Sequence, residues 1–93
     1  MELHNKMFMA AQSRAGRALL EWSQAQLAKK AGLSVSTVRN FEKGRSDPYG
    51  RNLHAIEGAL RTAGVEFLDA GAASIDGGIG VRLRADKQAG KRR

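Results

Sequence analysis

The feature that most constrains this chain is a pair of short helical patterns joined through one glycine, in "SQAQLAKKAGLSVSTVRNFEKG" at residues 23–44. Ser23 and Ser34 stand where a hydroxyl N-cap would begin each helix, and Gly32 stands where a left-handed residue would end the first one. Helices of about eight residues are not stable alone in water. Packing against the rest of the chain must therefore hold both of them.

Apolar spacing along the rest of the chain predicts four helices and two short strands. The helices are expected at residues 10–22, 24–31, 35–43 and 52–63, and the strands at 65–68 and 80–84. The expected core positions are Ala11, Ala15, Ala18, Leu19, Leu20, Trp22, Leu27, Ala28, Ala31, Leu33, Val38, Phe41, Leu53, Ile56, Ala59, Leu60, Val65, Phe67, Val81 and Leu83. The fold class is thus mostly α.

These elements divide the chain into four parts. A helical domain at residues 10–64 follows an N-terminal extension at 1–9 and precedes a strand and loop segment at 65–84 and a basic tail at 85–93, which is expected to be disordered. The loop between the strands is long for a tight hairpin. Pairing of the strands within one chain and pairing with a second copy are both left open.

Composition narrows the possible functions. The net charge of +7 and the sequence pI near 10.6 favour a polyanionic partner, either nucleic acid or an acidic protein surface. Cysteine is absent, and His4 and His54 have no matching ligand set, so we expect no metal and no cofactor. No nucleophile with a neighbouring base and no phosphate loop is evident, which argues against an enzyme. Without an apolar span or a signal peptide, we expect a cytoplasmic protein that does not enter a membrane.

The stretch "WSQAQLAKKAGLSVSTVRNFEKGRSDP" resembles the helix-turn-helix of the lambda repressor and Cro superfamily, also called the xenobiotic-response-element family. The resemblance covers residues 10–64. Its markers are Gln24, Ala28, Gly32, Val38, Phe41 and the "FEKG" ending. It implies that the helix at 35–43 enters the major groove of double-stranded DNA while the helix before it crosses the phosphate backbone.

On this reading the outward residues of the recognition helix are base-contact candidates. Arg39 can pair with guanine, Asn40 with adenine, Ser36 with several bases, and Val35 can touch a thymine methyl group. The alternative is that these residues are the solvated face of an ordinary helix. Candidates for phosphate contacts are Gln24, Ser34, Thr37, Lys43 and Arg45.

The phosphate candidates also have an alternative interpretation, in which they serve the fold or are simply solvated. Ser34 is also a cap, and Lys43 and Arg45 can simply be solvated. The family further implies a structural ion pair between Arg17 and Glu42, which would fix the recognition helix against the first helix.

The resemblance stops before the fifth helix of the usual family domain, because strands are expected in its place. Short exposed strands tend to pair either within the chain or with a second copy, and some antitoxins of this superfamily dimerise through such a strand. We therefore expect a homodimer that shares sheet edges, with recognition helices one DNA turn of about 34 Å apart. The expected function is a transcriptional regulator, most simply a repressor. The alternatives are an antitoxin that also binds a toxin, which copurification would reveal, and an adaptor that binds only proteins.

Overall fold

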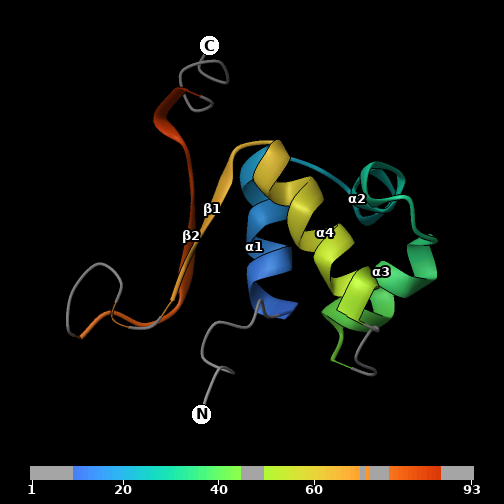
Figure 1. Ribbon diagram of the computed structural model, residues 1–93, viewed down its shortest axis with the longest axis horizontal. Helices are drawn as coiled ribbons and strands as arrows, with labels where there is room; N and C mark the ends of the chain where they lie inside the picture. Colours follow the sequence, from blue (N-terminus) through green and yellow to red (C-terminus); the bar gives the residue numbers. More distant parts are fainter. Residues whose placement is uncertain (1–9, 45–49, 70, 72–75, 87–93) are drawn as a thin grey trace.

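The computed structural model describes residues 10–44, 50–69, 71 and 76–86, and it confirms a mostly α fold followed by two short strands. In chain order the elements are α1 (Ala10–Leu20), α2 (Gln24–Ala31), α3 (Val35–Glu42), α4 (Gly50–Thr62), β1 (Val65–Leu68) and β2 (Gly80–Leu83). Figure 1 shows the helices packed together, with the strands beyond α1 on one side and α3 on the other.

The turn between α2 and α3 forms as its residues predict. The Ser23 hydroxyl accepts a hydrogen bond from the Gln26 amide at 3.0 Å, and the Ser23 amide donates to the Gln26 side chain at 2.7 Å, which completes a capping box. At the other end Gly32 adopts a φ of 73°, and the Leu33 amide donates to the Ala28 carbonyl at 2.9 Å. This left-handed glycine lets the chain turn sharply into α3.

Helix α1 ends two residues earlier than the expected 10–22. Glu21 adopts a φ of 60°, and the Trp22 amide donates to the Arg17 carbonyl at 2.9 Å, so the helix closes after Leu20. This is the same kind of ending that Gly32 gives α2, although here a residue with a side chain takes the left-handed conformation. Trp22 leaves the helix and packs, partly buried, against the core.

The expected apolar face of α1 was wrong at three positions, although Leu20 is buried as expected. Ala11, Ala18 and Leu19 are exposed, whereas the buried residues of this helix are Gln12, Ser13, Gly16 and Leu20. The reason is close packing: a Cβ placed on Gly16 would lie 3.4 Å from the Val65 side chain and 3.5 Å from that of Leu60. A helix that approaches its neighbours this closely needs small or hydrogen-bonding residues on its inner face, and apolar periodicity does not detect them.

Other boundaries shift by smaller amounts. Helix α4 begins at Gly50 instead of residue 52, α3 ends at Glu42 with Lys43 as its C-cap, and β2 ends at Leu83. The N-terminal extension at 1–9 and residues 87–93 of the tail lie outside the described residues, whereas Ala85 and Asp86 are helical. Within the described ranges, no helix is long and apolar enough to cross a bilayer.

The two strands pair with each other within one chain, which settles the arrangement that the sequence left open. They run antiparallel, and the register places Val65 opposite Leu83 and Glu66 opposite Arg82. The Gln12 side chain of α1 donates to the Gly80 carbonyl at 3.0 Å, so the helix is tied to the start of β2. The hairpin is thus attached to the helical domain by packing and by a side-chain hydrogen bond.

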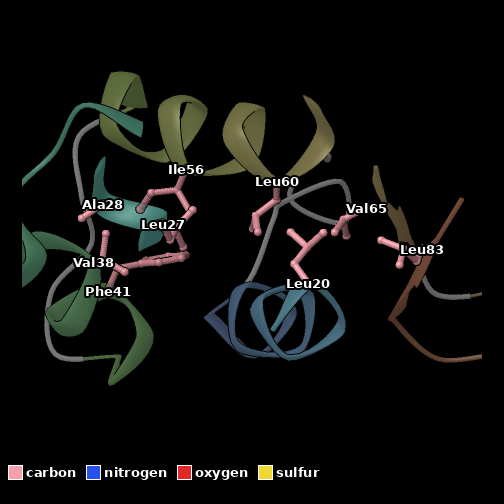
Figure 2. Close-up of a cluster of buried hydrophobic side chains, with 9 residues drawn as sticks. All are labelled: Leu20, Leu27, Ala28, Val38, Phe41, Ile56, Leu60, Val65 and Leu83. Atoms are coloured by element: carbon pink, nitrogen blue, oxygen red, sulfur yellow. The ribbon is translucent and has the colours of Figure 1, made fainter. Parts of the chain in front are cut away.

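The core has two neighbouring groups, as Figure 2 shows. One group joins α2, α3 and α4 and consists of Leu27, Ala28, Val38, Phe41 and Ile56. The other joins α1, α4 and the hairpin and consists of Leu20, Leu60, Val65 and Leu83. Helix α4 contributes to both through Ile56 and Leu60, and so connects the two ends of the molecule.

Candidate DNA-binding site

Helix α3 separates its residues into an inner and an outer face. Val38, Phe41 and Glu42 are buried, whereas Ser36, Arg39 and Asn40 are exposed. Val35, the fourth candidate for a base contact, is half-buried and packs against the core. The structure therefore brings three of the four candidates together on one open face and turns Val35 partly inward.

The hydroxyl groups at the start of α3 contact one another. The Ser34 hydroxyl accepts from the Thr37 amide at 3.2 Å, and it lies 2.9 Å from the Thr37 hydroxyl and 3.3 Å from that of Ser36. Ser34 is therefore a true N-cap, as its alternative reading held. Its hydroxyl already has partners within the chain, although Ser34 and Ser36 remain exposed.

The Glu42 side chain is the centre of a buried hydrogen-bond network between three helices. Arg17 of α1 donates to Glu42 through Nη2 at 2.8 Å and through Nε at 3.0 and 3.1 Å, so the implied ion pair is present. The Ser13 hydroxyl of α1 donates to Oε2 at 2.5 Å, and the side-chain Nε2 of Gln24 in α2 donates to Oε1 at 3.1 Å. Only 1% of the Glu42 side chain is exposed. This network fixes α3 relative to α1 and α2.

Ser13 and Arg14 are the two members of this network that sequence reasoning missed. Ser13 is fully buried, and Arg14 donates through Nη1 to the backbone carbonyl of Glu42 at the end of α3. The spacing of Ser13, Arg14 and Arg17 along one helix was the available signal, because residues three and four apart share a helix face. That signal carries meaning only once Glu42 is known to be buried beside them.

The network also sets the protonation state of its acid. Burial of the Glu42 carboxylate on its own raises its pKa, but hydrogen bonds from Arg17, Ser13 and Gln24 and the charge of Arg17 outweigh burial. The pKa of Glu42 therefore lies below its ordinary value. Glu42 is ionised at neutral pH and pairs with Arg17 in the charged form.

Several basic side chains lie exposed on α2 and α3. On α2 and α3, Lys29, Lys30 and Arg39 are exposed and make no ion pair with any other described residue. The Lys30 ammonium group instead lies 6.0 Å from the centre of the Trp22 ring. Lys43 is likewise exposed at the end of α3, whereas Arg45 lies outside the described residues. The exposed cations on α3 and at its end, Arg39 and Lys43, favour a polyanionic ligand on this side of the chain.

Comparison with known families matches this arrangement to a helix-turn-helix family, whose model aligns with residues 14–67, more than half of the chain. The chain belongs to this family, the lambda repressor and xenobiotic-response-element type of helix-turn-helix protein. Its members are DNA-binding regulators, so this helix-turn-helix protein is a DNA-binding regulator. A search of curated proteins found no match to the chain.

Proposed function

We propose that this helix-turn-helix protein is a sequence-specific transcriptional repressor that binds a two-fold symmetric operator as a homodimer. The observation that carries the proposal is the outer face of α3, where Ser36, Arg39 and Asn40 are exposed while Glu42 at its end is anchored to α1 and α2. A rigid helix with an open polar face fits the major groove. Occupying a promoter in this way represses transcription by excluding polymerase.

Each side chain on this face has a distinct proposed role. Arg39 donates two hydrogen bonds to a guanine, Asn40 pairs with an adenine, and Ser36 contacts a neighbouring base. Val35 can offer only part of its side chain to a thymine methyl group, because it also packs against the core. Arg39 and Asn40 therefore carry most of the sequence specificity.

Four of the proposed phosphate contacts lie around this face, namely Gln24, Ser34, Thr37 and Lys43. The fifth, Arg45, lies outside the described residues. One N–H of the Gln24 side chain donates to Glu42 at 3.1 Å, and the second can donate to a phosphate oxygen. Glu42 thus holds Gln24 in place at the start of α2, where free backbone amides and the helix dipole also favour an anion.

The test is fluorescence anisotropy of the purified protein on DNA from upstream of its own gene and on a scrambled duplex of equal length, across a salt series. We expect tight binding to the first duplex and weak binding to the second, with both affinities falling as salt rises. Equal, weak affinity for the two duplexes would argue against autoregulation. Operators selected from a random DNA pool would then show whether the chain recognises any sequence.

A further inference from the structure

The β-hairpin lies on the opposite side of the molecule from the recognition helix α3, with α1 and α4 between them (Figure 1). It therefore cannot enter the groove that α3 occupies. Its charges also differ from those around α3, because the cations here have acidic partners. Arg82 pairs with Glu66 at 2.6 Å, Arg84 with Asp86 at 3.5 Å, and Arg61 of α4 with Glu57 at 2.7 Å. Among the described residues, this end therefore has little positive charge without an acidic partner.

The two faces of the hairpin carry different residues. Val65 and Leu83 lie opposite each other in the register and are buried against the helices. Side chains alternate along a strand, so the next pair, Glu66 and Arg82, lies on the outer face. Their side chains are 39% and 64% exposed. In the described part of the chain, the helices thus cover one face of this small sheet and leave Glu66 and Arg82 exposed on the other.

The outer face includes a shallow hollow with balanced charge. Its volume is about 510 Å³, and its lining residues are Glu66, Arg82, Leu83, Arg84, Ala85 and Asp86. Two acids and two arginines therefore surround one depression. Ile79, just before β2, adds an apolar side chain that is 47% exposed at the far end of the hairpin.

We propose that this outer face, centred on Glu66 and Arg82, is the surface through which two copies of the chain pair. An interface with two-fold symmetry brings the same patch of each copy together, so the patch must be complementary to itself. A glutamate directly beside an arginine meets this requirement, because a two-fold axis between the copies lets Glu66 of each face Arg82 of the other. The proposal rests on the dimeric operator binding proposed above, and it names the surface that makes the dimer.

The position of this surface also sets the spacing of the DNA half-sites. The chain extends 42 Å along its longest axis, and the hairpin and α3 lie toward opposite ends of that axis. Two copies joined at their hairpins therefore hold their recognition helices farther apart than one DNA turn of about 34 Å. The next allowed separation on the same side of DNA is two turns, about 68 Å.

The decisive experiment exchanges the charges in separate chains and then mixes them. Glu66→Arg alone would bring two arginine side chains together across the interface, and Arg82→Glu alone would bring two glutamates together. We expect native mass spectrometry to show each variant as a monomer at a concentration where the wild type is a dimer. An equimolar mixture should form a heterodimer, because the opposite charges then face each other.

The matched control is Glu57→Arg, which reverses the half-buried acid of the Glu57–Arg61 pair on α4. This variant should remain a homodimer like the wild type, and mixing it with Arg82→Glu should produce no excess of heterodimer. If Glu66→Arg and Arg82→Glu each stay dimeric, or their mixture stays monomeric, the interface lies elsewhere and the proposal is wrong. A wild type that is monomeric both free and on DNA would equally overturn it.

A second measurement covers the case in which a charge-reversed chain does not fold. The protein has no cysteine, so Ala85→Cys introduces a single thiol at the edge of the hollow. A short bismaleimide should cross-link two copies of Ala85→Cys, but not two copies of Lys29→Cys, whose thiol lies on α2. Equal cross-linking of both variants, or of neither, would count against the hairpin surface.

Operators selected from random DNA separate this proposal from the function on which it rests. Half-sites about two turns apart would support pairing through the hairpins, whereas half-sites one turn apart would overturn it and leave sequence-specific repression intact. Conversely, a charge-dependent dimer that selects no sequence would support the interface and reject the repressor function.

Discussion

The two ends of this helix-turn-helix protein each contain an arginine and glutamate pair, and the two pairs have similar geometry in different surroundings. Arg17 and Glu42 lie 2.8 Å apart beside α3, with 19% and 1% of their side chains exposed. Arg82 and Glu66 lie 2.6 Å apart on the hairpin, with 64% and 39% exposed. Distance alone therefore does not distinguish the pairs, and burial does.

Burial gives the two pairs different consequences. The Glu42 carboxylate has no access to water, so it depends on Ser13, Arg17 and Gln24, and losing any of them would leave a poorly compensated charge. Water solvates the hairpin pair, whose contribution to folding is correspondingly small. The charges of the buried Arg17–Glu42 pair are thus committed to holding the recognition helix, whereas those of the exposed hairpin pair remain available to a partner.

The largest expected effect comes from breaking the buried pair. Glu42→Ala should lower the free energy of unfolding by about 3–5 kcal/mol, because Arg17 would lose its counter-charge inside the domain. Thermal or urea denaturation followed by circular dichroism measures this loss. The matched change in the partly exposed pair on α4, Glu57→Ala, should cost at most about 1 kcal/mol. An unchanged melting temperature for Glu42→Ala would contradict the claim that the buried pair stabilises the fold more than an exposed pair does.

Acid should weaken the α3 end through the same carboxylate. The pKa of Glu42 is lower in the folded chain than the value of about 4.3 expected when unfolded, so its stabilising effect is complete above that pH. The effect is lost as the pH falls through the lower, folded-state pKa. Melting temperatures measured between pH 7 and acid should therefore fall below about pH 4 for the wild type.

The Glu42→Gln variant serves as the control for this acid transition. It should start from a lower melting temperature at neutral pH and show a shallower fall on acidification, because the titrating group is absent. Parallel curves for the two proteins would mean that other carboxylates dominate acid unfolding.

A smaller effect, on the affinity for DNA and not on the stability of the fold, tests the exposed face of α3. Arg39→Ala should weaken binding to the selected operator by about 1–3 kcal/mol and change binding to random DNA much less. Anisotropy titrations on both duplexes measure the difference. Lys29→Ala, a change of an exposed cation on the outer side of α2, should have little effect on either. If Arg39→Ala weakened both duplexes equally, Arg39 would be a phosphate contact.

The smallest expected effect concerns α4, which links the two ends. A Cβ placed on Gly58 would meet nothing within 4 Å, so the fold itself has room for a larger residue there. Gly58→Ala should stabilise the chain by about 0.5–1 kcal/mol, because alanine loses less backbone freedom on entering a helix. A rise in melting temperature would confirm this, and a fall would show that the chain needs glycine at this position.

The accuracy of sequence reasoning differed between these same two ends. Ser23, Gly32 and Ser34 act locally, through capping hydroxyls and a left-handed turn, and the structure places them as their residue types predict. The pairing of Arg17 with Glu42 came from the family resemblance. At the other end, apolar spacing predicted that Ala11, Ala18 and Leu19 would be buried, and the structure exposes them. The prediction failed because α1 approaches α4 and the hairpin closely through small and polar residues, which leave no apolar periodicity in the sequence.

By itself, then, the sequence determined the features that short-range chemistry controls: the helix starts, the sharp turn at Gly32, and the alternation of Glu66 and Arg82 with their apolar neighbours. Only the tertiary structure decided which face of α1 is buried, that β1 pairs with β2 in the same chain, and that Ser13 and Arg14 join Glu42. The physical reason is the distance along the chain between the residues that interact. Caps and turns involve residues a few positions apart, whereas burial and ion pairing depend on segments that meet only when the whole chain has folded.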